Sequence, residues 1–120
     1  MRNVIFVFGS NTEGIHGAGA AYEAVKNWNA IHGQAGGRQG NSYAIVTKDL
    51  SKGERSVNLS YIERQLGEFN KHARQNQSEV FIVTAVGTGL AGFTHSEIKD
   101  ILQSYDWPLN VYFNSELLTK

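Results

Sequence analysis

The sequence contains no cysteine, which excludes a disulfide framework and a thiolate metal site. No apolar run approaches the roughly 20 residues that cross a bilayer, and no signal-peptide pattern precedes the first apolar segment. Lysine plus arginine balance aspartate plus glutamate at 11 each, so the clustered positive charge that nucleic-acid binding requires is lacking. We therefore expect a soluble, cytoplasmic protein with no nucleic-acid partner and no membrane contact.

The chain is poor in proline but rich in glycine: it has one proline and 13 glycines. Residues 8–21, FGSNTEGIHGAGAA, include four glycines and three alanines. Each glycine costs backbone entropy on folding, so this density indicates that the backbone comes close to another molecule. The length of 120 residues predicts a single domain over 1–120 with one modest core.

Apolar residues alternate along the chain between strand-like and helix-like spacing. Nearly continuous β-rich runs predict strands at 3–8, 42–47, 79–86 and 110–113. Helical spacing predicts a helix over 19–31 and helix faces over 59–73 and 98–105. Segment 33–42 is interpreted as a flexible loop, and 48–56 as a polar connection. This order predicts an α/β fold, with a mostly parallel or mixed central sheet and helices on both faces.

Two of the predicted helices have capping-box spacing at their starts. Ser60 and Glu63 have this spacing in one helix, and Thr94 and Glu97 have it in the other. The core is expected to be built from the apolar strand residues Ile5, Phe6, Val7, Ala44, Ile45, Val46, Phe81, Ile82 and Val83.

Two predicted strands end in glycine-rich turns, 9–19 and 87–93, that lead into helix N-termini. In an open parallel sheet, ligands bind beyond the carboxyl ends of the strands. Helix N-termini present unpaired N–H groups and the positive end of the helix dipole, which suit a phosphate or diphosphate. Alternatively, the glycines serve only tight turns and helix–sheet packing. Neither turn has the spacing of a Walker loop or of the dinucleotide fingerprint.

Three stretches, taken in order, resemble macro domains. VIFVFGSN…HGAGAAYEA resembles their first core strand, Asn and glycine loop; SYAIVTKD resembles the next core strand; and VFIVTAVGTGLAGFTHSEI resembles the second phosphate loop and its flanks. These motifs are most similar to those of the compact terminal ADP-ribose protein glycohydrolase group. The resemblance implies a macro-like three-layer domain that takes a small-molecule nucleotide or ADP-ribose derivative.

The resemblance also implies roles for individual residues. Asn11 would contact the distal ribose, and Lys48 would match the strand-end lysine that attacks the ribose carbon in the glycohydrolase group. The first phosphate loop would be lined by Gly14, Gly17 and Gly19. The second would include Thr88, Gly89, Leu90, Ala91, Gly92 and Phe93, and its backbone N–H groups would bind the diphosphate.

Two departures from the family pattern bear on the chemistry. The glycohydrolase group has an acidic residue at the position of Ala91, and an alanine cannot transfer a proton. His16 or Asp49 would have to take that role. The strand that carries an adenine-anchoring Asp in many macro domains also has no counterpart, so Asp49 or an aromatic side chain would have to replace it. Arg38 and His95 are further candidates for a phosphate contact.

Three functions remain open at this point. The first is binding of ADP-ribose or a related nucleotide. The second is hydrolysis, as an ADP-ribosyl glycohydrolase or ADP-ribose phosphatase that uses Lys48, His16 or both. The third is a non-enzymatic protein-interaction domain with a vestigial pocket. No histidine pair has metal-ligand spacing with carboxylates around it, so we predict neither a metal nor a cofactor.

Overall fold

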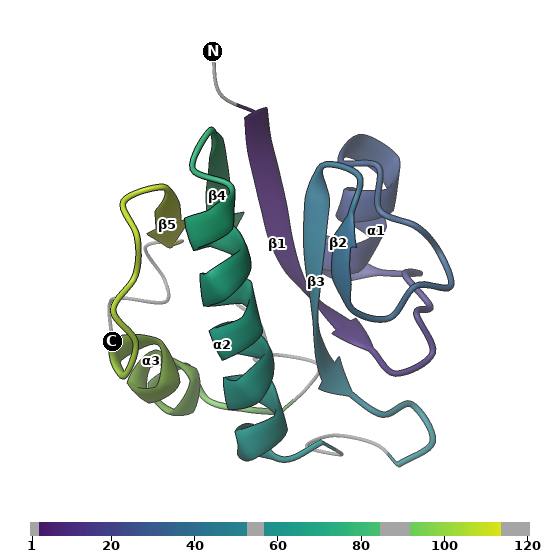
Figure 1. The fold of residues 1–120 in the computed structure, drawn as a ribbon. Coiled ribbons are helices and arrows are strands. Elements are labelled where there is room, and N and C mark those ends of the chain that lie inside the picture. Colours follow the sequence, from purple (N-terminus) through teal and green to yellow (C-terminus); the bar gives the residue numbers. More distant parts are fainter. Residues whose placement is uncertain (1–2, 53–56, 85–91, 114–120) are drawn as a thin grey trace.

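The computed structural model describes residues 3–52, 57–84 and 92–113. Its elements in chain order are β1 (Asn3–Asn11), α1 (Gly19–Asn27), β2 (Gly37–Gln39), β3 (Ser42–Lys48), α2 (Leu59–Gln75), β4 (Glu79–Val83), α3 (His95–Gln103) and β5 (Val111–Phe113) (Figure 1). The sheet has the order β2-β3-β1-β4-β5. Neighbouring strands are parallel except for β2 and β3. No helix within the described residues is both long and apolar enough to cross a bilayer.

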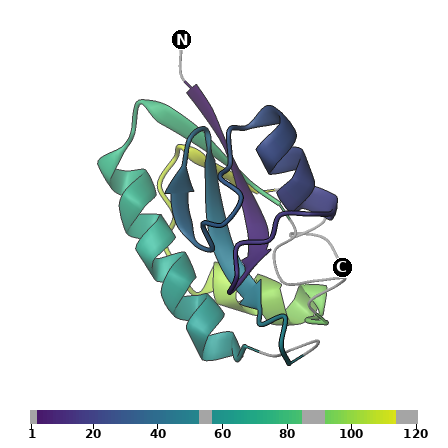
Figure 2. The ribbon, with the colours of Figure 1, turned by 90° about the vertical axis from the view of Figure 1, so that its right-hand side faces the viewer.

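Strand β1 is apolar on both faces because both faces of the sheet are covered. Ile5 and Val7 belong to the larger core cluster, which includes residues of α2 and α3. Phe8 belongs to the smaller cluster, with Ala21 and Ala24 of α1. Figure 2 shows α1 on one side of the sheet and α2 on the other. The expected α/β fold, a mixed sheet with helices on both faces, is confirmed.

The larger cluster depends on the apolar face of α2. Ile62, Leu66, Phe69 and Ala73, at alternating spacings of four and three residues, are all fully buried. Burying a side chain of this size contributes about 1.5–3 kcal/mol. This face therefore holds the longest helix against the sheet.

The two capping predictions have different outcomes. The box at α3 is confirmed: the Thr94 hydroxyl accepts from the Glu97 N–H at 3.1 Å, and Glu97 Oε1 accepts from the Thr94 N–H at 2.9 Å. The box at Ser60 and Glu63 is wrong, because the N-cap of α2 lies two residues earlier. Its cap is Asn58, whose side-chain oxygen accepts from Tyr61 N–H at 2.9 Å. Asparagine is among the best N-cap residues.

Helix α1 ends at Asn27, four residues before the predicted end. Trp28 leaves the helix and stacks on Phe6, with ring centres 5.2 Å apart. Asn29 follows with a φ of 62°, a left-handed conformation that does not continue a helix. Because α1 is short, it covers its face of the sheet less completely. Phe6 and Ile82, both predicted to be core residues, are only half-buried.

The segment 33–42 is not the flexible loop that we predicted, since it contains β2. This strand pairs antiparallel with the start of β3, from Gln39 opposite Ser42 to Gly37 opposite Ala44. Beyond that point, Gln65 of α2 takes over the edge of β3. Its side chain accepts from the Val46 N–H and donates to the Val46 carbonyl, each at 2.7 Å.

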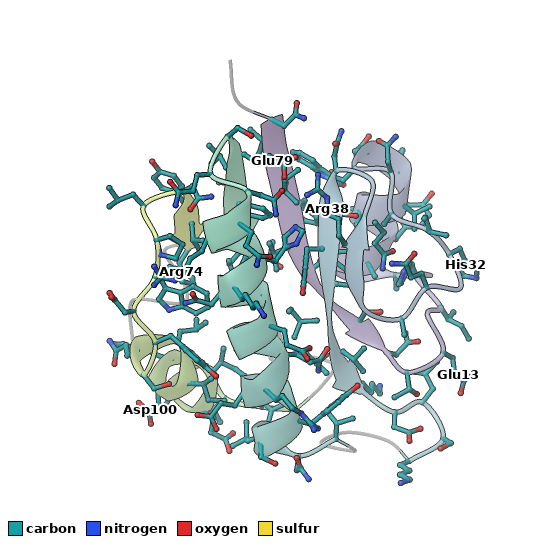
Figure 3. The ribbon with its side chains drawn as sticks, viewed as in Figure 1. Glu13, His32, Arg38, Arg74, Glu79 and Asp100 are labelled. Atoms are coloured by element: carbon teal, nitrogen blue, oxygen red, sulfur yellow. The ribbon has the colours of Figure 1, made fainter. Side chains whose placement is uncertain are left out.

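An ion pair anchors β2 at the edge of the sheet where β1 and β4 begin. The guanidinium of Arg38 donates to both carboxylate oxygens of Glu79, at 2.7 and 2.8 Å, and Figure 3 shows the two side chains side by side. Arg38 Nη1 also lies 3.3 Å from His72 Nε2. Arg38, a candidate phosphate ligand in the sequence, is thus engaged at the edge where β1 and β4 begin.

This cluster makes stability depend on pH. Burial lowers the pKa of His72, and Arg38 lowers it further against the opposing effect of Glu79. The unfolded chain therefore takes up this proton at a higher pH than the folded protein does. The contribution of His72 to the free energy of unfolding is therefore fully present above its ordinary pKa of about 6.5. This contribution is lost as the pH falls through the lowered pKa of the folded protein.

We expect urea denaturation to show a smaller free energy of unfolding at about pH 5.5 than at about pH 7.5. The variant His72→Gln keeps an acceptor for Arg38 but does not titrate, so its decline over this interval should be smaller. Equal declines in the two proteins would contradict the assignment to His72.

Candidate functional site

The carboxyl ends of three strands meet at one edge of the sheet, because β1 runs parallel to both β3 and β4. This is the lower edge of the sheet in Figure 1. Asn11 ends β1, Lys48 ends β3, and the two residues are partners in the strand register. The Thr12 N–H also donates to the Lys48 carbonyl at 2.9 Å. The structure thus brings together two residues that we predicted for the site.

The side chain of Asn11 shapes the turn that follows it. Its oxygen accepts from the N–H groups of Glu13 and Ile15, at 3.2 and 2.9 Å, and its amide nitrogen donates to the Ile15 carbonyl at 2.7 Å. An amide has two N–H hydrogens, so one remains available to another acceptor. The predicted ribose contact, if it is made, depends on that second hydrogen.

Gly14 is required by the protein itself. Its φ is 68°, and an added Cβ would lie 2.5 Å from the carbonyl carbon of Gly33 and 2.7 Å from the Gln34 nitrogen. The Gly33 N–H donates to the Gly14 carbonyl at 2.7 Å. Close packing between these two loops is therefore sufficient to explain why residue 14 is a glycine.

Gly17 and Gly19 are exposed and have no such neighbour. Among the described residues, a Cβ on Gly17 would meet only a methyl group of Ile15, at 4.0 Å, and one on Gly19 would meet nothing within 4 Å, although the φ of 59° at Gly19 itself favours glycine. Helix α1 begins here, and its N-cap residue, Ala18, makes no side-chain capping bond. The first turn of α1, all of which the structure describes, contains no acidic residue. Its first N–H groups are therefore available to donate hydrogen bonds to an anion.

His16 lies between these glycines but is directed inward. Only 2% of its surface is exposed. Its Nε2 lies 3.1 Å from the Gln34 carbonyl and 3.3 Å from Gln39 Oε1. The Ile31 N–H donates to the same Gln39 oxygen at 2.8 Å, which fixes the orientation of that amide. Both neighbours of Nε2 are acceptors, so Nε2 carries the proton.

Consequently, the ring proton of His16 is bonded within the protein, and the ring packs edge-on against Phe8, with centres 5.3 Å apart. Its other nitrogen, Nδ1, is buried and has no hydrogen-bond partner among the residues that the structure describes. The structure does not present His16 to the surface beside Lys48. A catalytic role for His16 stays a prediction, one that would need this loop to rearrange.

Two charged candidates lie where β3 ends: Lys48 is its last residue, and Asp49 follows directly. Lys48 is half-buried and forms no ion pair with the described residues. The side chain of Asp49 accepts from the hydroxyl and N–H of Ser51, at 2.7 and 3.0 Å. These hydrogen bonds lower the pKa of Asp49. Near neutral pH, Asp49 is therefore an ionised carboxylate, which can accept a proton but has none to donate.

The second predicted loop is only partly described. Thr88, Gly89, Leu90 and Ala91 lie outside the described residues. Gly92 has a φ of 82°, which favours glycine. Phe93 is 4% exposed and belongs to the larger core cluster, so its side chain packs inward, and only its backbone is left for a ligand.

Gln39 is the main residue that the sequence analysis missed. It is 1% exposed, although a glutamine between glycines is typical of a solvated loop. No pattern in the sequence distinguishes it from Gln34 or Gln75. Its burial follows from strand β2, which was not predicted.

A separate hollow of about 500 Å³ lies between α2 and the β2–β3 hairpin. Its lining includes Tyr61, Arg64, Gln65 and Glu68 of α2 and the backbone of 35–37. None of residues 9–19 lines it. This hollow is therefore distinct from the edge where the glycine loop lies. Within the described residues, no group of three or more His, Asp or Glu side chains could hold a metal ion.

Comparison with known proteins supports the fold. No family model matches the chain, and no curated protein matches it. Among solved structures, it is similar to a chain of "Thermosipho africanus DarTG in complex with ADP-ribose", with a TM-score of 0.61 and 15% sequence identity. The match covers 96% of this chain and 39% of that one. At this identity the likeness is one of fold, and the fold is macro-like.

The two kinds of glycine should respond differently to substitution. Gly14→Ala places a methyl group against the Gly33 backbone and forces an alanine to a positive φ, so we expect a loss of about 1–3 kcal/mol or more. Gly17→Ala meets open space and should leave stability unchanged or slightly raised. Urea denaturation measures both. Equal stabilities for the two variants would show that Gly14 is not held against Gly33.

Proposed function

We propose that residues 1–120 form one macro-like domain that binds ADP-ribose or a related phosphorylated nucleotide at the carboxyl edge of the sheet. The observation that carries this proposal is the open N-terminus of α1. Gly17 and Gly19 keep side chains away from it, and Ala18 supplies no competing cap. The structural neighbour from Thermosipho africanus, which is in complex with ADP-ribose, gives independent support.

The chemistry of this edge fits the parts of such a ligand. A diphosphate suits the unpaired N–H groups and positive dipole of a helix N-terminus. A ribose suits the position beside Asn11, which has one amide hydrogen to give, and Lys48 contributes a positive charge on the next strand end. We propose that the backbone of residues 88–92 completes the phosphate site from the loop after β4.

The vestigial-pocket alternative predicts side chains that fill the ligand space. Around Gly17 and Gly19, the described residues leave that space open. A glycine kept only for structure would resemble Gly14, whose missing Cβ is occupied by backbone, or Gly19, whose φ is 59°. Among the described residues, Gly17 has neither feature. This contrast favours a binding site over a purely structural loop.

Isothermal titration with ADP-ribose tests the proposal, and we expect saturable binding. Gly17→Val places a branched side chain in the proposed phosphate position, so affinity should fall at least about tenfold, the loss of one charge-assisted phosphate contact. Adenosine, which lacks the diphosphate, is the control ligand and should bind far more weakly. No heat with the wild-type protein, and no protection of amides 12–19 from hydrogen exchange, would defeat the proposal.

A hydrolytic activity is the second candidate, because Lys48 and Asn11 are register partners. As a nucleophile, Lys48 must first lose a proton from its ammonium group; its amine would then form a bond to the ribose carbon while the bond to the leaving group breaks. The leaving group keeps the electron pair and needs a proton. Ala91 cannot supply it, and the His16 proton is bonded to acceptors inside the protein. We therefore infer binding with slow or no turnover.

Restoring the missing carboxyl group tests this inference. Ala91→Asp should raise the release of ADP-ribose from an ADP-ribosylated protein by roughly 10²-fold or more, the usual contribution of a general acid or base. Adding Lys48→Ala to this variant should abolish the gain, while titration confirms that ligand still binds. Rapid wild-type turnover would overturn the inference, and turnover unaffected by Lys48→Ala would remove Lys48 from the mechanism.

A further inference from the structure

A buried amide connects strand β2 to the first glycine loop. The side-chain oxygen of Gln39 accepts from the Ile31 N–H at 2.8 Å and lies 3.3 Å from His16 Nε2. Its side-chain nitrogen donates to the Gln34 carbonyl at 3.0 Å. One side chain thus binds both ends of the segment 31–34 and the ring of His16.

The segment 31–34 in turn supports the glycine loop. The Gly33 N–H donates to the Gly14 carbonyl at 2.7 Å, and the His16 N–H lies 3.3 Å from His32 Nδ1. The His16 ring also reaches the Gln34 carbonyl at 3.1 Å. Residues 14–16, which lead directly into Gly17, are therefore held from outside by a second loop.

Gln39 itself is fixed by the sheet. Gln39 pairs with Ser42 in the register of β2 and β3. The Ser42 hydroxyl also donates to the backbone carbonyl of Gln39 at 2.6 Å. The preceding residue, Arg38, is held by Glu79 through two hydrogen bonds. The support for the glycine loop therefore starts from a strand that is paired and anchored.

We propose that Gln39 is a positioning residue for ligand binding: it holds the first glycine loop in its binding geometry through His16 and the segment 31–34, without touching the ligand. This rests on the proposed function. Surface loops without such support open locally at low free-energy cost. When the binding-competent geometry is only partly populated, the apparent affinity falls by the same fraction.

The test compares two variants that each replace a buried amide by an apolar side chain of similar size. Gln39→Met removes the contacts to Ile31, Gln34 and His16. The control, Asn70→Leu, removes a donor to the Asp106 carbonyl and an acceptor for Arg74, on the far face of the sheet. Amide hydrogen exchange is measured without ligand, and ADP-ribose affinity is measured by titration.

In Gln39→Met, we expect amides 14–17 to exchange about tenfold faster or more and ADP-ribose affinity to fall by a similar factor, as for the loss of two or three hydrogen bonds. Asn70→Leu should keep wild-type exchange at 14–17 and wild-type affinity, whatever its stability. Gln39→Glu retains the acceptor for Ile31 and His16, so it should restore part of the protection. If Gln39→Met does not fold, His32→Leu, at an exposed position, should loosen residues 14–17 to a smaller extent.

Equal exchange at 14–17 in Gln39→Met and Asn70→Leu would overturn the proposal, as would a loosened loop with unchanged affinity. Wild-type protein that does not bind ADP-ribose would defeat the proposed function instead. The exchange measurement would still decide whether Gln39 holds the loop, because it needs no ligand.

Discussion

The parallel pairing of β1 with β3 on one side and with β4 on the other is the constraint from which the rest of this structure follows. It sends the carboxyl ends of the three strands to one edge of the sheet. It also buries both faces of β1, which requires a helix on each side. Antiparallel pairing of either neighbour would separate Asn11 from Lys48, or the end of β1 from the end of β4.

Within that edge, the glycines of the first loop divide into two groups by what surrounds them. Gly14 lies against backbone and joins the loop to its support, whereas Gly17 and Gly19 border open space at the start of α1. The first group gives the loop a fixed shape, and the second leaves room for the anion that we propose. A loop with only the second kind of glycine would pay a larger ordering entropy when the ligand arrives.

Much of the fold could be predicted from the sequence because its signals are local. Continuous apolar runs identified β1, β3 and β4, and helical spacing identified the buried face of α2. The box at Thr94 and Glu97 likewise depends on residues three positions apart. Strand β2 could not be predicted in this way, because three polar and glycine residues become a strand only through pairing with β3 and the Arg38–Glu79 contact.

The same distinction applies to the site. The resemblance to macro domains places Asn11 and Lys48 at one site, and both follow apolar runs that predict strands of one parallel sheet. The inward direction of His16 could not be predicted, since it depends on Gln39 and Gln34, which are brought to it by long-range packing. The end of α1 was misjudged for a similar reason: Trp28 has the spacing of a helical residue, but stacking on Phe6 takes it out of the helix.

The contact between Gln65 and Val46 has a consequence for how the protein behaves among other chains. Strand β2 covers only the first part of β3, and an uncovered strand edge offers a row of backbone donors and acceptors to any extended peptide. Gln65 occupies both backbone groups of Val46 with its own amide, in the way that a neighbouring strand would. A β-strand from a second molecule therefore finds no hydrogen-bond partner at that position, and the exposed part of the edge is a poor template for aggregation.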